Sequence, residues 1–131
     1  MPFQLGDSFW VQTTHEPVEH LWILITKSNP LNNSAVWVNA TTARPGSDRT
    51  TVLQPRDHPA IRHESVIFYR GAKLVDLVKL QGLIQAAKAR SESRCPGSLL
   101  LKIQAGILAS KFTPRKIQNH FKAEKAAGRV C

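Results

Sequence analysis

The pattern of apolar and polar positions divides the chain into a first part of short strands and a second part of helices. Over the first seventy residues, apolar residues alternate with polar ones or form short β-branched runs, and both patterns predict extended segments. Clusters of Asn, Pro, Ser and Gly separate these runs and predict the connecting loops. The predicted strands are residues 8–13, 20–27, 35–41, 50–54 and 64–70.

The period of the pattern changes after this point. Many short strands followed by helices predict the α+β class, with a small barrel or sandwich closed by helices. Ser98 is expected to be an N-cap, as is Thr113, with Pro114 at the first helical position. The predicted segments are an extended stretch that becomes helical at 74–90, a linker at 91–97, and helices at 98–110 and 113–125.

Length and composition predict a single domain spanning residues 1–131, mainly strands over 1–72 and mainly helical and basic over 73–131. The longest apolar run, Leu21–Ile25, is far shorter than the roughly 20 residues of a membrane span, and the N-terminus does not resemble a signal peptide. Cys95 and Cys131 make no disulfide framework. We therefore expect a cytoplasmic protein that does not enter a membrane.

Charge is distributed unevenly along the chain. The net charge is +9, and all of the excess lies after residue 66, where the chain has thirteen Lys and Arg and three Asp and Glu. Such a polycation is either a solvated helical face or a contact surface for nucleic acid or an acidic protein. The same alternatives apply to helix 113–125, where Ile117 and Phe121 can dock on the strands while the lysines point to water or contact RNA.

The candidate chemistry is that of a nuclease that works without metal. Glycine-rich phosphate loops and the CxxC and HExxH motifs are absent from the sequence. The spacing of His58 and His63 suits neither one helix face nor a strand pair, so we expect no metal and no cofactor. RNA cleavage without metal needs one group to take the 2′-OH proton and one to protonate the leaving 5′-oxygen. Histidine can serve either step, although each histidine alone is more commonly structural.

Four motifs occur in an order that resembles the MazF/PemK/Kid toxins of bacterial toxin–antitoxin pairs: "GDSFWVQ", "HLWILIT", "VWVNATT" and "FYRG". The resemblance covers roughly residues 5–85. It implies a small SH3-like β-barrel with C-terminal helices, usually a homodimer. It also implies a metal-independent endoribonuclease that cuts single-stranded RNA by attack of the 2′-OH, and a cognate antitoxin protein that blocks the RNA groove.

The resemblance also assigns candidate roles to residues. Thr41 falls on the threonine that contacts the scissile phosphate, and His20 falls where the family has an arginine. His63 lies close to the arginine of the late strand, whereas the acidic partner of that arginine has no counterpart here. Two hypotheses remain: a ribonuclease whose active site is built on two histidines, or a barrel that binds nucleic acid or protein without catalysis.

On the ribonuclease hypothesis, the candidate site residues divide into a catalytic set and an RNA-binding set. The loop over residues 57–63 is then expected to bring His58 and His63 to the mouth of a phosphate groove. A third hypothesis is that the chain is an effector that acts on a host protein, as the gyrase-poisoning relatives of this fold do. The candidate catalytic residues are His20, His63, Thr41, Ser65 and Tyr69, and the candidate RNA-binding residues are His58, Arg62, Arg70, Thr42, Arg44 and Lys27.

Overall fold

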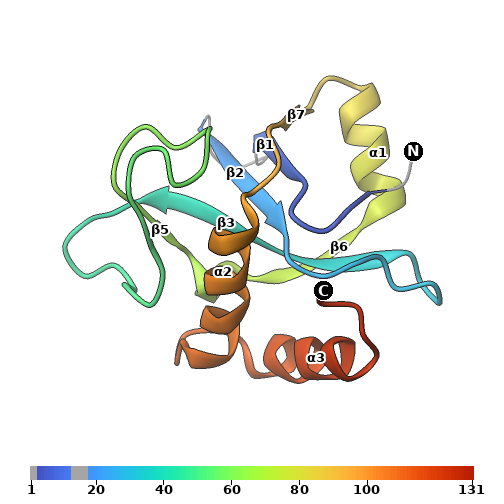
Figure 1. Ribbon diagram of the computed structural model, residues 1–131. Helices are drawn as coiled ribbons and strands as arrows, with labels where there is room; N and C mark the ends of the chain where they lie inside the picture. Colours follow the sequence, from blue (N-terminus) through green and yellow to red (C-terminus); the bar gives the residue numbers. More distant parts are fainter. Residues whose placement is uncertain (1–2, 13–17) are drawn as a thin grey trace.

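Seven antiparallel strands form one sheet, and three α-helices pack around it (Figure 1). The computed structural model describes residues 3–12 and 18–131. The α+β class predicted from the sequence is confirmed. The strands are β1 (Ser8–Gln12), β2 (Glu19–Leu24), β3 (Ser34–Thr42), β4 (Val52–Leu53), β5 (Ser65–Ile67), β6 (Lys73–Asp76) and β7 (Ala89–Glu92), and the helices are α1 (Leu77–Gln85), α2 (Gly97–Ala109) and α3 (Arg115–Ala126), with a 3₁₀ turn, η1, at Tyr69–Gly71.

Strand β3 is the centre of the sheet. It pairs with β2 along one edge and with both β5 and β6 along the other, so that 65–76 forms one long strand interrupted by η1. The strand order is β4-β5-β3-β2-β1-β7. Within the described residues no pairing joins β7 to β4, so the sheet is open, and the closed barrel implied by the resemblance is not observed.

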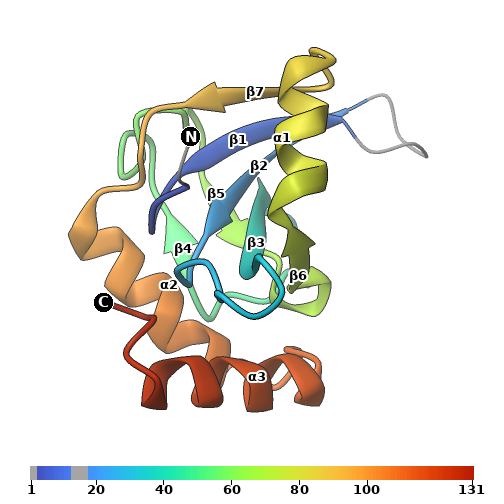
Figure 2. The ribbon, with the colours of Figure 1, turned by 90° about the vertical axis from the view of Figure 1, so that its right-hand side faces the viewer.

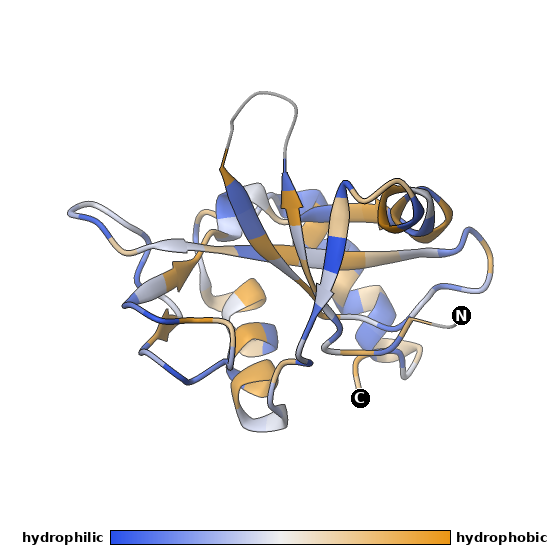
Figure 3. Cartoon of the chain, turned by 90° about the horizontal axis from the view of Figure 1, so that it is seen from above, coloured by the Kyte–Doolittle hydropathy of each residue, from blue (hydrophilic) through white to orange (hydrophobic). Residues whose placement is uncertain are grey.

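The two faces of the sheet bury separate apolar clusters. On β3, Val36 and Val38 belong to the cluster beneath α2 and α3, whereas Ala35 and Trp37 belong to the cluster beneath α1. Figure 2 shows α1 on one side of the strands and α2 and α3 on the other. Apolar and polar residues alternate along several strands (Figure 3), as the period of two requires. Strand β2 is buried on both faces from Leu21 onward, as its apolar run predicted.

The stretch 74–90, predicted to begin extended and become helical, contains three elements. Strand β6 precedes α1, and β7 follows it after a turn at Ala87, whose φ is 60°. β7 was missed because its sequence, "ARSE", has little apolar character, and what makes it a strand is antiparallel pairing with β1. The region after residue 72 is thus less purely helical than predicted.

The predicted helix caps are displaced by one or two residues. α2 begins at Gly97, with Pro96 as its N-cap, so that Ser98 lies inside the helix. α3 begins after Pro114, and the side chain of Thr113 is buried with no hydrogen bond among the described residues. A proline N-cap provides no side-chain acceptor, so tertiary packing rather than side-chain capping sets these helix starts.

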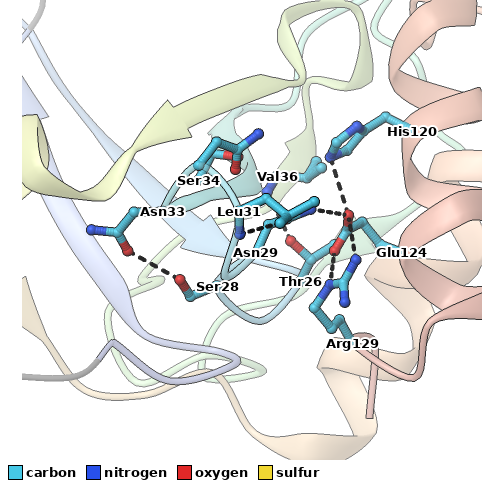
Figure 4. Close-up of polar contacts among 11 residues, drawn as sticks. Thr26, Ser28, Asn29, Leu31, Asn33, Ser34, Val36, His120, Glu124 and Arg129 are labelled. Carbon is cyan, nitrogen blue, oxygen red and sulfur yellow. Dashed lines mark hydrogen bonds and ion pairs between the residues drawn. The ribbon is translucent and has the colours of Figure 1, made fainter.

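The β2–β3 loop and the C-terminal tail are joined to α3 by Glu124 (Figure 4). Glu124 is 2% exposed, and its carboxylate accepts hydrogen bonds from Asn29 Nδ2 at 2.9 Å and Arg129 Nε at 2.5 Å. His120 Nε2 lies 3.6 Å away. The hydrogen bond from Arg129 is the main reason that the pKa of Glu124 is lowered. A buried carboxylate held in this way fixes α3 against the sheet.

The apolar side of α3 packs on the sheet, as one of the two alternatives given above for helix 113–125 requires. Ile117 and Phe121 are 4% and 1% exposed and belong to the cluster beneath the sheet. No helix of the described chain is both long and apolar enough to cross a membrane. The basic residues of α3 point to solvent: Arg115, Lys116, Lys122 and Lys125.

Candidate functional site

A hollow of about 530 Å³ opens where β2 begins and β3 ends. Antiparallel pairing places Leu21 of β2 opposite Ala40 of β3, so the start of one strand lies beside the end of the other. The loop before β5 reaches the same place, because Thr42 pairs with Ser65. We call this the histidine hollow, and seven residues predicted from the sequence line it: His20, Thr41, Thr42, Arg44, Arg62, His63 and Ser65.

The two histidines of the histidine hollow come from different elements. His20 is half-buried at the start of β2, and His63 is exposed in the loop before β5. The Nε2 atom of His63 lies 3.0 Å from Oγ1 of Thr42, and this hydrogen bond orients the ring. Two imidazoles on one hollow can supply both an acid and a base.

The histidine hollow also has the charge that a phosphate requires. Arg44 and Arg62 line it, and both are exposed. Glu19 is the carboxylate among its lining residues, and it lies 3.0 Å from Arg90 Nη2, which compensates its charge. The arginines therefore dominate the field in the hollow.

Thr41 connects the histidine hollow to two further depressions. One, the phenylalanine hollow, has a volume of about 220 Å³ and includes Phe68, Arg70 and Phe112. The other, the lysine hollow, has a volume of about 420 Å³ and includes His20, Phe68 and Lys73. Because Thr41 lines all three, they form one continuous surface at the end of β3.

Tyr69 is a structural residue, contrary to the prediction that it orients a phosphate. Its side chain is fully buried, and its hydroxyl donates to the carbonyl of Ile103 in α2 at 2.9 Å and lies 2.6 Å from Thr51 Oγ1. Burial raises the pKa of Tyr69 far above its ordinary value. A phenol enclosed in this way joins α2 to the sheet and cannot contact RNA.

His58 is also structural, contrary to the prediction that it lies at the mouth of the groove. It is 0% exposed, and its Nδ1 accepts a hydrogen bond from the backbone of Ala60 at 3.0 Å. Because Ser8 Oγ donates to Gly6, the 3.0 Å contact from Nε2 to Ser8 is a donation by the imidazole. The loop 57–63 therefore presents one histidine to solvent and uses the other as an internal brace.

The buried His58 predicts a loss of stability in mild acid. Burial lowers the pKa of His58, and nearby Glu92 only partly opposes this. The unfolded chain then binds the extra proton more readily, so the free energy of unfolding falls as the pH drops below about 6.5. The slope is limited to about 1.4 kcal/mol per pH unit for one proton. Urea denaturation between mildly acidic and neutral pH measures it, and an equal slope in His58→Gln would contradict the assignment.

Three other predicted residues have positions different from those expected. Ser65 is 2% exposed and its hydroxyl donates to the carbonyl of His63 at 3.0 Å, so it shapes the loop rather than meeting the phosphate. Lys27 follows the far end of β2 and lines none of the three hollows. Arg70 lies in the phenylalanine hollow, where its guanidinium stacks on Phe112.

Metal-ligating side chains are not gathered at one place in the described part of the chain. Over residues 3–12 and 18–131, no cluster of three or more His, Cys, Asp or Glu could hold a metal ion. His58, which the sequence placed near His63, uses both ring nitrogens in protein contacts.

Comparison with known proteins shows which known fold this chain resembles. No family model matches the sequence, and no curated protein matches it. Among solved structures, a chain from the MazE–MazF complex of Deinococcus radiodurans matches 83% of this chain and 95% of its own length, with a TM-score of 0.56 and 10% sequence identity. The chain has a MazF-like fold. At 10% identity the MazF-like fold is what the likeness establishes, and the chemistry must be argued from the site.

Sequence reasoning missed part of the surface that the MazF-like fold assembles. Phe68 and Phe112 are 42% and 37% exposed, although apolar side chains in such patterns are usually buried. Phe68 lies in a predicted strand, and Phe112 falls in the short gap between two predicted helices. The signal available was a large aromatic residue beside a lysine in that gap, Lys111-Phe112, with two more basic residues shortly after it at Arg115 and Lys116.

Proposed function

We propose that this chain is a metal-independent endoribonuclease, the toxin of a toxin–antitoxin pair, which cleaves single-stranded RNA by attack of the 2′-OH. The observation that carries the proposal is the histidine hollow. It gathers His20, His63 and Thr41 with two arginines at one end of a MazF-like fold. No other hollow described contains two imidazoles together with a hydroxyl and arginines.

The reaction needs a base and an acid on opposite sides of the phosphorus. One imidazole takes the proton from the 2′-OH, and the 2′-oxygen forms a bond to phosphorus. The bond from phosphorus to the 5′-oxygen breaks, and the other, protonated imidazole gives its proton to that oxygen. The products are a 2′,3′-cyclic phosphate and a 5′-hydroxyl, and His20 and His63 are the two imidazoles.

Other residues of the hollow hold the phosphate. Thr41 donates a hydrogen bond to a non-bridging oxygen, and Arg44 and Arg62 stabilise the charge that develops in the transition state. Thr42 acts through His63, because its hydroxyl lies 3.0 Å from the ring. It is a positioning residue rather than a catalytic one.

The partners follow from the same proposal. A structural neighbour belongs to a complex described as MazE–MazF, which supports an antitoxin partner for this chain. We further propose that the chain acts as a homodimer in the cytoplasm and that the antitoxin covers the histidine hollow.

The direct test is cleavage of single-stranded RNA by the purified protein in EDTA. Cleavage products are expected to carry 2′,3′-cyclic phosphate and 5′-hydroxyl ends, read by end-specific labelling and mass spectrometry. Because no residue of the mechanism requires a metal, the rate should be the same with EDTA and with Mg²⁺. Cleavage that stops on chelation would contradict the mechanism.

A non-catalytic binding module is the second candidate. The excess of basic residues after residue 66 and the exposed lysines of α3 favour it. Such a module binds RNA or an acidic protein with a steep dependence on salt and does not cut. Binding without cleavage in the EDTA assay would select it.

A further inference from the structure

The phenylalanine hollow has features that cleavage does not use. Its volume of about 220 Å³ is smaller than the roughly 300–1,000 Å³ of pockets for drug-sized ligands, so it suits one small planar group. Two partly exposed rings, Phe68 and Phe112, line it, and the Arg70 guanidinium carbon lies 4.8 Å from the centre of the Phe112 ring. Aromatic rings interleaved with cations are the surface on which unpaired nucleobases stack.

The ring of Phe68 is held in place by a glycine. A Cβ atom at Gly71 would lie 2.8 Å from Cδ2 of Phe68, so the ring packs directly on the backbone of η1. Gly71 does not have a positive φ, so it is the close approach of the ring rather than backbone conformation that requires a glycine here. A ring fixed on one side and 42% exposed is a pre-organised stacking surface.

The ring of Phe112 is held by the turn between α2 and α3. Ser110 Oγ donates to Asp48 at 2.6 Å and accepts from the backbone of Phe112 at 3.1 Å. Burial tends to raise the pKa of Asp48, but the hydrogen bonds from Ser110 and Thr50 outweigh it and leave the pKa lowered. The carboxylate is thus engaged in fixing the turn, and Lys111 lies beside the ring at 5.9 Å.

The phenylalanine hollow lies next to the place where the phosphate is expected. Thr41, Thr42 and Arg44 line both this hollow and the histidine hollow. A phosphate at Thr41 is therefore adjacent to the hollow that Phe68 and Phe112 line.

We propose that the phenylalanine hollow is a nucleobase subsite, which stacks a base of single-stranded RNA adjacent to the cleaved phosphate. This inference rests on the proposed function, since it takes RNA as the substrate. It adds a recognition element from the α2–α3 turn, which lies outside the stretch that resembles the toxins. Stacking accepts any base, so the subsite contributes affinity rather than strict sequence choice.

The test is binding of a short, fluorescein-labelled single-stranded RNA of mixed sequence, methylated at every 2′-oxygen so that it cannot be cut. Fluorescence polarisation at low salt gives the Kd. Phe112→Ala and Phe112→Leu should each weaken binding by about 10-fold, whereas Phe112→Trp should bind close to wild type. Leu101→Ala, which removes an exposed apolar side chain of α2 outside the three hollows, is the matched control and should change nothing.

The outcomes separate this inference from the cleavage proposal. Unchanged Kd values for Phe112→Ala and Phe112→Leu would overturn the subsite, even if the wild-type protein cuts RNA. Wild-type affinity in Phe112→Leu alone would also overturn it, because an apolar contact would then replace stacking. Loss of affinity in both variants, in a protein that does not cut, would support the subsite and defeat catalysis. Thermal unfolding of each variant confirms that it is folded.

Discussion

Replacing His63 by alanine is expected to reduce RNA cleavage by at least about 100-fold, the usual contribution of a general acid or base. The same loss is expected for His20→Ala, because each imidazole performs one of the two proton transfers. The double variant should lose little more than the worse single variant, since groups that act as a unit are not additive. Cleavage rates under single-turnover conditions in EDTA measure all three.

Binding provides the control for this prediction. Both single variants should bind the 2′-methylated RNA about as well as wild type, because proton transfer does not contribute to ground-state affinity. His120→Ala, which alters a histidine of α3 outside the three hollows, should cut RNA at the wild-type rate. Equal cleavage by His63→Ala and wild type would reject the two-histidine mechanism.

Replacing Gly106 by alanine is expected to lower the free energy of unfolding by about 2–3 kcal/mol. A Cβ at this position in α2 would clash with the Tyr69 hydroxyl and would lie 2.6 Å from Thr51 Oγ1. The hydroxyl of Tyr69 bonds to both α2 and Thr51, so it cannot move away without losing buried hydrogen bonds. Urea denaturation followed by circular dichroism gives the value.

Gly82→Ala is the matched control, because Gly82 is also a helical glycine. It is exposed in α1, and a Cβ at this position would meet nothing within 4 Å. Alanine should therefore stabilise the chain there by up to about 1 kcal/mol through helix propensity alone. If Gly106→Ala stabilised the chain as Gly82→Ala does, the close packing of α2 on Tyr69 would be wrong.

The histidine hollow could be predicted in outline because the resemblance to the toxins assigns His20, Thr41 and His63 to one site. The motifs "HLWILIT" and "VWVNATT" contain His20 and Thr41, and the structure pairs the two strands antiparallel with Leu21 opposite Ala40. The positions of His58 and Tyr69 could not be predicted. A polar side chain in a strand or loop has the same local pattern whether it faces solvent or an internal hydrogen-bond partner.

The sequence by itself determined the α+β class, the strands of the first seventy residues and the charge asymmetry. These depend on local periodicity and on which side chains exist. Only the tertiary structure decided that β7 is a strand, that Tyr69 is internal, and that Phe112 and Phe68 line the same hollow. The physical reason is that each of these facts depends on a partner far away in the chain, and burial and pairing with distant residues leave no periodic signal in the local sequence.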